Sequence, residues 1–287
     1  MLKSLFTRTA LLLPFITTCV VAEPLVWQAE NANRQFIILG SIHAGDENFY
    51  PLPTAFTAHW DSADALVVEA NILKPSSAQL NPAIATTAQM LTDSEKQSLA
   101  TTAKLAGLSS SPLLSSPPWL AAISLQMKMA EQAGLSPDRG IDITLLKRAQ
   151  AKQMPILELE SIEQQLRLME QLDDHGKDLL MTTVNEWEEM TNQLSCLISA
   201  WQAGDQQQLA TLFDDSQYTD KTDAALINDR NHDWAKQLTN DPTYQRGKFL
   251  IVVGAMHLLG EEGLPALLKQ QGFSIKQLSQ SEQVSCG

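Results

Sequence analysis

The chain has 287 residues and carries 33 acidic against 20 basic side chains, which gives a formal net charge of −13. A protein this acidic repels phosphate backbones and anionic lipid surfaces, so nucleic acid is not an expected partner. The length predicts one large domain with ample chain for a hydrophobic core, and the composition is neither collagen-like nor disordered in type.

The first 22 residues have the pattern of a secretory signal peptide. Lys3 and Arg8 charge its leading segment, an apolar run covers residues 10–21, and small residues predict cleavage after Ala22. We therefore expect a secreted or periplasmic protein whose mature part is 23–287. Loss of the two basic residues takes its net charge from −13 to −15. No later stretch reaches 18 apolar residues, so no membrane span is expected after cleavage.

The use of the three cysteines depends on export. Cys19 lies inside the predicted signal peptide, and a lipoprotein anchored there is the alternative, although Thr18 is unusual before a lipidated cysteine. Cys196 and Cys286 remain in the mature chain. An oxidising compartment favours a disulfide between them, which would tie the C-terminal tail to a central helix. Two unpaired thiols are the other possibility.

Taken in chain order, six segments have the pattern of β-strands. Four are short and almost continuously apolar, as in strands that are covered on both faces of an α/β sheet. Two candidate edge strands lie near the ends of the chain. The apolar runs are 35–39, 65–70, 155–159 and 248–253, with Gly40 and Gly254 expected to stop the first and the last, and the edge strands are 26–28 and 274–278.

Between the strands the apolar period becomes helical. Loops are expected at 71–82 and 107–118, where Ser and Pro cluster. The predicted helices are 53–63, 94–106, 118–133, 141–152, a long stretch from 161 to about 213 with breaks near Gly176 and Gly204, 222–239 and 264–271. This order predicts an α/β fold with a central, mostly parallel sheet built from the N- and C-terminal parts, flanked by helices, with a large helical insertion at about 83–240.

Two Gly-x-x-His segments, Gly40–His43 and Gly254–His257, each follow an apolar strand directly. Ligands bind at the carboxyl ends of strands in open α/β sheets, and completing the sheet should bring the two segments together. Glycine allows a sharp turn or a close ligand, and histidine can ligate a metal or move a proton near neutral pH. The alternative is that each histidine only caps a turn.

Acidic residues occupy comparable positions. Glu69 ends the second strand and Glu160 follows the fourth at the start of a helix. A carboxylate at the end of an apolar strand must be solvated, paired or functional. Two histidines with one or two glutamates would suit zinc, manganese or cobalt, and they would serve equally as a metal-free acid/base cluster. Glu160 could instead simply stabilise the N-terminus of its helix.

The segments 139–142 (Arg-Gly-Ile-Asp) and 228–231 (Asn-Asp-Arg-Asn) are the remaining polar groups of interest. Arg230 and Asn231 could both reach the crevice from a helix shortly before the last strand. There Arg230 could clamp a carboxylate or stabilise an oxyanion, or it could pair with a glutamate of the site. His59, His175 and His232 lack a comparable context and are expected on the surface.

Together these residues resemble the TraB/GumN family. The resemblance rests on an ordered series of segments that covers nearly the whole mature chain, so 23–287 is expected to be one TraB/GumN-like domain. The segments are 38–46, 50–53, 67–70, 139–142, 159–165, 229–231, 253–260 and 263–264. The wider group includes the Tiki proteins, metal-dependent proteases that use two Gly-x-x-His histidines and acidic residues at a metal centre.

The resemblance implies His43 and His257, with Glu69 or Glu160, as ligands of a divalent ion such as Mn, Co or Zn. The leading hypothesis is a metal-dependent hydrolase, with peptidase activity as one form of it, that acts on a peptide or another small substrate of the cell envelope and uses Arg230 as a clamp. A metal-free hydrolase with His43 as general base and a non-catalytic envelope binding protein are the alternatives. No zincin, nucleophile-elbow, P-loop or dinucleotide motif occurs in the sequence.

Overall fold

The structure is a computed structural model that describes residues 22–214 and 218–286. The predicted signal peptide, apart from Ala22, lies outside these residues, and so does the alternative lipid anchor at Cys19. Among the described residues, no helix is long and apolar enough to cross a membrane.

All six predicted strands are confirmed, and they form one sheet in the order β4-β3-β5-β2-β1-β6. β4, β3, β5 and β2 run parallel, while β1 pairs antiparallel with both β2 and β6. The strands are β1 Val26–Glu30, β2 Arg34–Ser41, β3 Ala65–Val68, β4 Ile156–Glu158, β5 Gly247–Gly254 and β6 Ser274–Gln277.

One strand prediction is wrong in position. The segment 26–28 belongs to β1, which is not an edge strand, because the C-terminal β6 returns and pairs with its outer side. The two edge strands of the sheet are therefore β6 and the short β4.

The pairing of β2 with β5 sets the two Gly-x-x-His segments side by side. In the parallel register, Gly40 lies opposite Val253 and Ser41 opposite Gly254. Both strands run on to or through their glycines instead of stopping before them. Every residue of β2 from Phe36 to Ser41 is buried, as expected for a central strand covered on both faces. The N- and C-terminal parts of the chain thus meet at the carboxyl ends of these two central strands.

The predicted helices are present, with several differences, the first of which is the unpredicted four-residue helix α2 at Thr87–Met90. The region 107–118 was expected to be a loop but contains α4, because Ser109 caps a helix of six residues there. The predicted helix 53–63 is only a four-residue helix followed by a short 3-10 turn. The helices are α1 Thr54–Thr57, α2 Thr87–Met90, α3 Asp93–Leu105, α4 Ser110–Ser115, α5 Pro118–Gln132, α6 Ile141–Ala151, α7 Ile162–Gln171, α8 Lys177–Asn185, α9 Trp187–Gln202, α10 Gln206–Asp214, α11 Asp220–Asp223, α12 Asp229–Asn240 and α13 Leu264–Gln270.

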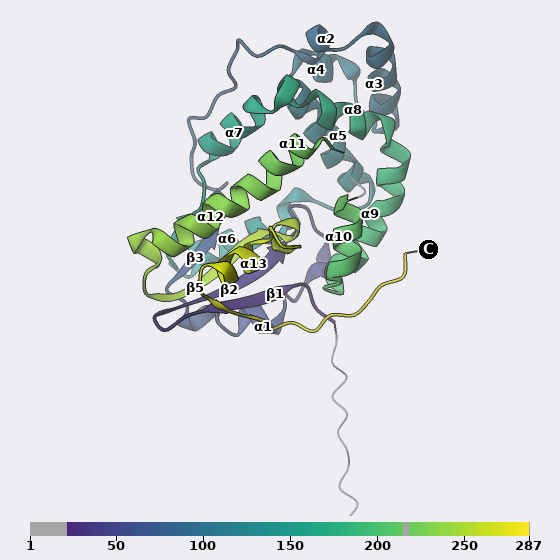
Figure 1. Ribbon diagram of the computed structural model, residues 1–287. Coiled ribbons are helices and arrows are strands. Elements are labelled where there is room, and N and C mark those ends of the chain that lie inside the picture. The colour runs from purple at the N-terminus through teal and green to yellow at the C-terminus, as the bar shows by residue number, and fades with distance from the viewer. Residues whose placement is uncertain (1–21, 215–217, 287) are drawn as a thin grey trace, which may run out of the picture.

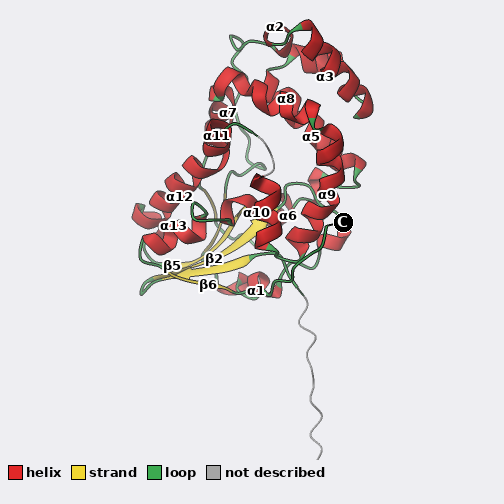
Figure 2. Cartoon of the chain, turned by 45° about the vertical axis from the view of Figure 1, so that its right-hand side comes forward, coloured by secondary structure: helices red, strands yellow, loops and turns green. Residues whose placement is uncertain are grey.

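Most of the buried apolar side chains in the described part of the chain belong to two clusters. The larger one holds the sheet and the helices that flank it, including α6, α12 and α13. The smaller one is entirely helical and joins α3, α4, α5 and α8. Figures 1 and 2 show these helices at the end of the molecule that is remote from the sheet. The region 83–240 is mainly helical, with β4 as its contribution to the sheet.

The predicted disulfide between Cys196 and Cys286 is confirmed. The two Cα atoms lie 5.5 Å apart, and the bond links residues 90 positions apart in the chain. It fastens the C-terminal tail to α9, and a hydrogen bond from the Val284 amide to Asp205 holds the tail two residues earlier.

Candidate functional site

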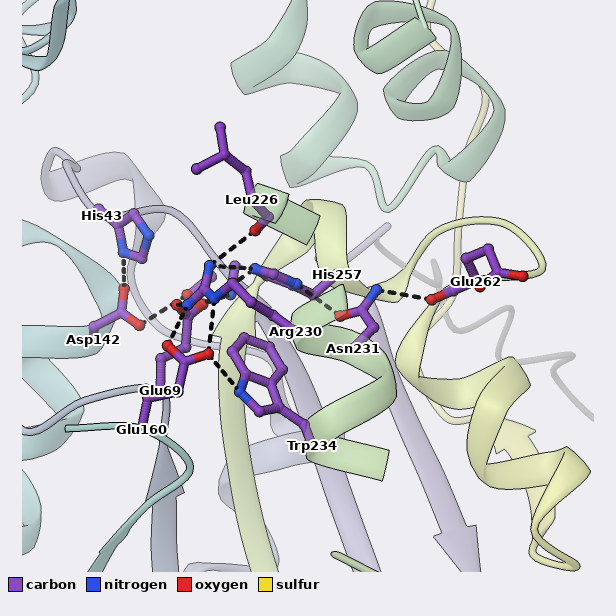
Figure 3. A network of polar contacts seen from close by, with 12 residues as sticks. His43, Glu69, Asp142, Glu160, Leu226, Arg230, Asn231, Trp234, His257 and Glu262 are labelled. Atoms are coloured by element: carbon purple, nitrogen blue, oxygen red, sulfur yellow. Dashed lines mark hydrogen bonds and ion pairs between the residues drawn. The ribbon is translucent and has the colours of Figure 1, made fainter. Parts of the chain in front are cut away.

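The site forms where β2, β3 and β5 end. His43 lies two residues beyond β2, Glu69 directly follows β3, and His257 lies in a 3-10 turn that begins immediately after β5. Glu160 hydrogen-bonds through its amide to the carbonyl of Glu69, because the chain leaving β4 continues the parallel pairing for two more residues. The predicted convergence of the four side chains at one edge of the sheet is therefore observed (Figure 3).

His43 is held by a carboxylate. Its Nδ1 lies 3.0 Å from Asp142 Oδ2, and the other oxygen of Asp142 accepts a hydrogen bond from Ser41. Asp142 is in the first turn of α6, which the hydrogen bond from the Ile141 amide to the Ile42 carbonyl joins to the His43 turn. The His43 side chain is 67% exposed, and its Nε2 has no hydrogen-bond partner among the described residues.

The charge of Asp142 raises the pKa of His43 to about 9, with a smaller contribution from Glu69. His43 is therefore an imidazolium at neutral pH. It is a base only in a minor fraction of molecules there, and that fraction grows as the pH approaches 9.

His257 is in a different environment, because it is buried and its partner is neutral. Its Nδ1 lies 2.7 Å from Asn231 Oδ1. The Asn231 amide nitrogen donates to the Glu262 carbonyl, so its oxygen must face the histidine, and His257 carries its proton on Nδ1. Burial lowers the pKa of His257 to about 4, even though Glu69 favours the charged form. His257 is neutral throughout the physiological range.

Arg230, in the first turn of α12, is the centre of the site. Its Nε and Nη2 donate to the two oxygens of Glu160 at 2.9 and 3.0 Å, and Nη2 also donates to Glu69 at 2.6 Å. Nη1 donates to the Leu226 carbonyl and to His257 Nε2, at 3.1 and 3.2 Å. All five N–H groups of this guanidinium are therefore used inside the protein.

Glu69 has the least exposed carboxylate of the site. Burial alone would raise its pKa, but Arg230, the two histidines and the amide of Gly254 together hold that pKa at about 2. The Gly254 amide donates to it at 2.7 Å. Glu69 thus links the end of β3 to the end of β5 and is fully ionised at neutral pH.

Three contributors were not assigned a role from the sequence. Asp142 and Asn231 lay in segments that had been singled out, but only the fold shows that they orient His43 and His257. Trp234 had no signal, although its position one helical turn after Arg230 could have suggested contact. Its indole donates to Glu160 at 2.9 Å, and its ring packs against both Arg230 and His257.

Other predicted residues lie outside the network. Arg139 pairs at the surface with Glu47, so only Asp142 of its segment reaches the site. His232 is exposed and pairs with Glu262, as a surface residue would. His59 and His175 are half-buried and do not contact the site.

The resemblance raised the expectation of a divalent ion on His43, His257, Glu69 and Glu160. Both oxygens of Glu160, one oxygen of Glu69 and Nε2 of His257 already accept hydrogen bonds from Arg230, and the other oxygen of Glu69 accepts from the Gly254 amide, so a guanidinium occupies the place that a metal would need. Among the described residues, no group of three or more His, Cys, Asp or Glu side chains is arranged to hold a metal ion. In this arrangement the four residues do not fit a metal ion.

Comparisons with known proteins identify relatives over the same span. YbaP, an uncharacterized protein of Escherichia coli (strain K12), is 33% identical over 242 residues, which cover 83% of this chain and 89% of the relative. YbaP of Shigella flexneri matches with the same identity and coverage. No solved structure matches the chain. The model of the TraB/PrgY/gumN family matches residues 25–277, and the chain belongs to this family.

Proposed function

We propose that this chain is a hydrolase of ester or amide bonds that uses His43 to transfer protons and works without a resident metal ion. The observation that carries the proposal is the Asp142–His43 pair. It leaves an exposed ring nitrogen, Nε2, at the carboxyl ends of the strands, directly beside a buried ionic network. A histidine oriented through Nδ1 by a carboxylate is the arrangement that hydrolases use for general acid–base catalysis.

The chemistry follows from the two nitrogens of His43. In its neutral form, Nε2 accepts a proton from a water molecule while the water oxygen forms a bond to the substrate carbonyl carbon. The same nitrogen then returns that proton to the leaving oxygen or nitrogen as the bond to the carbonyl carbon breaks. Asp142 keeps the proton on Nδ1 and stabilises the imidazolium that exists between the two steps.

Arg230 has a supporting role in this proposal. Because its five N–H groups are already used, it is a positioning residue that fixes Glu69, Glu160 and His257. It therefore does not act as the substrate clamp that the sequence suggested. The neutral His257 and the ionised Glu69 are fixed by these hydrogen bonds and line the site beside His43.

The test is an ester and peptide substrate screen at several pH values, with protein that has been treated with a chelator. We expect activity that survives chelation, rises with pH toward about 9, and falls by about 10²- to 10⁴-fold in His43→Ala. His59→Ala, which changes a histidine remote from the site, should retain full activity. Activity that disappears on chelation and returns with Mn, Co or Zn would refute the metal-free mechanism. A complete lack of turnover would favour the non-catalytic binding protein.

A metal-dependent hydrolase is the second candidate, and one observation favours it. Both histidines are held through Nδ1 by an oxygen, from Asp142 and from Asn231, so both direct Nε2 toward the site. Metal binding would require Arg230 to leave His257 and Glu69. Metal analysis of protein purified without chelator tests this candidate, which predicts bound metal in the wild type and none in a His43→Ala, His257→Ala double variant.

We also infer that the protein acts in the periplasm or outside the cell. The disulfide between Cys196 and Cys286 supports this inference, because such bonds persist in oxidising compartments. Mass spectrometry of the mature protein would test it. An N-terminus at Glu23 is expected, whereas a lipid-modified Cys19 would support the lipoprotein alternative.

A further inference from the structure

A cavity of about 670 Å³ lies between the helices above the site. Its walls come from α5, α9, α10 and the segment that precedes α12. The lining is largely apolar and includes Met129, Met190, Leu194, Leu197 and Met256. Cavities of this size and character hold small organic ligands, and flexible methionines let such a wall adapt to different apolar shapes.

Two backbone connections link this cavity to the proposed catalytic site. Met256, in its wall, is the residue that immediately precedes His257 in the second Gly-x-x-His segment. Leu226 also lines the cavity, while its carbonyl accepts a hydrogen bond from Arg230. Figure 3 shows that the Leu226 side chain points away from Arg230. The cavity therefore borders the ionic network, with Leu226 in contact with both and Met256 next to His257 in the chain.

That carbonyl reaches Arg230 because of a local departure from α-helical geometry. Residues Ala224–Asn228 form a π-helical turn between α11 and α12. Such turns are rare and concentrate at functional sites. Here the turn gives the cavity a leucine side chain and gives the ionic network a carbonyl oxygen.

The lining residues that carry a charge at neutral pH are all acidic. They are Glu186 and Glu189 at the start of α9 and Asp223 at the end of α11. No Lys, Arg or His is among the described lining residues. An apolar cavity with a negative rim is complementary to a molecule that combines an apolar body with a positive charge. A fatty acid or another amphiphilic anion would place its charge against these carboxylates.

We propose that this cavity is the substrate subsite of the hydrolase and that it binds amphiphilic cations, in which an apolar chain or ring system carries a protonated or quaternary amine. That the bound molecule is a substrate rests on the proposed function. The binding of an amphiphilic cation rests only on the cavity and its charges.

Isothermal titration calorimetry with three amphiphiles of equal chain length, each below its critical micelle concentration, tests the proposal. The probes are decyltrimethylammonium, decyl maltoside and decyl sulfate. We expect the cation to bind most tightly, and the sulfate to bind at least about tenfold more weakly than the cation. Equal affinity for the cation and the sulfate, or no binding of the cation, would overturn the proposal.

Matched variants separate the cavity from the acidic surface. Leu194→Trp fills the cavity and should abolish binding, whereas Leu105→Trp, at an exposed leucine on α3, should not change it. A cation that binds both variants equally well is adsorbed on the surface, and the proposal is then wrong. In the Glu186→Gln, Glu189→Gln double variant, affinity for the cation should fall by about fivefold while affinity for the maltoside stays constant. Glu188→Gln, on the same helix but outside the lining, is the control.

One more variant distinguishes a failure of this proposal from a failure of the proposed function. His43→Ala should bind decyltrimethylammonium as tightly as the wild type, since His43 does not line the cavity. Cation binding without any hydrolytic activity in the wild type would refute the proposed hydrolase and leave the cation site supported. Hydrolysis without cation binding would refute the cation site and leave the proposed hydrolase supported.

Discussion

The two Gly-x-x-His segments follow neighbouring parallel strands, yet their histidines have opposite properties. His43 is mostly exposed, faces a carboxylate and has a pKa of about 9. His257 is buried, faces an amide and has a pKa of about 4. At neutral pH one histidine is therefore charged and the other neutral, although the short motif is the same.

The motif fixes where each histidine stands, and its surroundings fix its charge: the Asp142 carboxylate in the case of His43 and burial in the case of His257. Asp142 and Asn231 are contributed by two different helices, and each contacts the Nδ1 atom of one ring. A carboxylate stabilises the imidazolium, whereas an amide oxygen leaves a buried ring neutral. The first histidine is suited to proton transfer, and the second forms part of the rigid interior.

The largest expected effect comes from removing the cation that this interior is built around. Arg230→Met leaves Glu69 and Glu160 buried without their partner, which should lower the free energy of unfolding by about 3–5 kcal/mol. Urea denaturation measures the change. The control Arg246→Met, at an exposed arginine, should change it by no more than about 0.5 kcal/mol. A stable Arg230→Met variant that binds a divalent ion would instead revive the metal site.

The pH dependence of stability should distinguish the two histidines in sign. The pKa of His257 is lower in the folded chain, about 4 against 6.5, so stability falls as the pH drops from about 6.5 to 4. Glu69, about 2 against 4.5, continues the loss between pH 4.5 and 2, and each group contributes about 3 kcal/mol. The raised pKa of His43 acts in reverse, with a stabilisation that is complete below pH 6.5 and is lost as the pH rises through about 9.

Urea denaturation at a series of pH values measures these changes in the free energy of unfolding. His257→Gln should remove the loss between pH 6.5 and 4 and leave the loss below pH 4.5, whereas His232→Gln, at an exposed histidine, should keep both. An unchanged profile in His257→Gln would show that the buried ring does not control acid stability.

Exchanging the partners should reduce the contrast between the rings. Asp142→Asn removes the main cause of the raised value, so the pKa of His43 should fall from about 9 toward 6.5. Asn231→Asp places a carboxylate beside His257, so its pKa should rise from about 4. NMR titration of the imidazole resonances measures both. If neither value moves, burial rather than the partner sets the charge of these rings.

The smallest effects concern the two glycines. A Cβ on Gly40 would lie 3.0 Å from both the Ala255 Cα and a Leu258 methyl, so Gly40→Ala should cost about 1–3 kcal/mol of stability. The three nearest atoms to a Cβ on Gly254 would belong to Glu69 at 3.4 Å, His257 at 3.5 Å and His43 at 3.9 Å, which are ordinary van der Waals distances. Gly254→Ala should therefore unfold like the wild type and lose activity, because its methyl group enters the site. Thermal denaturation beside the substrate screen checks both variants.

The strands and the convergence of the histidines and glutamates could be predicted from the sequence because they follow from continuous apolar runs and from the rule that parallel strands end at one edge. The internal position of β1 could not be, since it depends on the return of β6 from the far end of the chain. The roles of Asp142, Asn231 and Trp234 depend on how α6 and α12 are rotated against the sheet, which apolar periodicity does not determine. For the same reason the sequence left open whether Arg230 clamps a substrate or pairs with a glutamate, and the fold shows it paired with Glu69 and Glu160.

The π-helical turn at Ala224–Asn228 sets the angular phase of α12. Successive residues of an α-helix are rotated by about 100° around its axis, so one extra residue per turn changes the direction in which every later side chain points. Arg230, Asn231 and Trp234 all follow the turn and all face the sheet edge. Deletion of the single residue Ile227 would change the direction of these three side chains together, so the part of the site that α12 contributes depends on the length of this one turn.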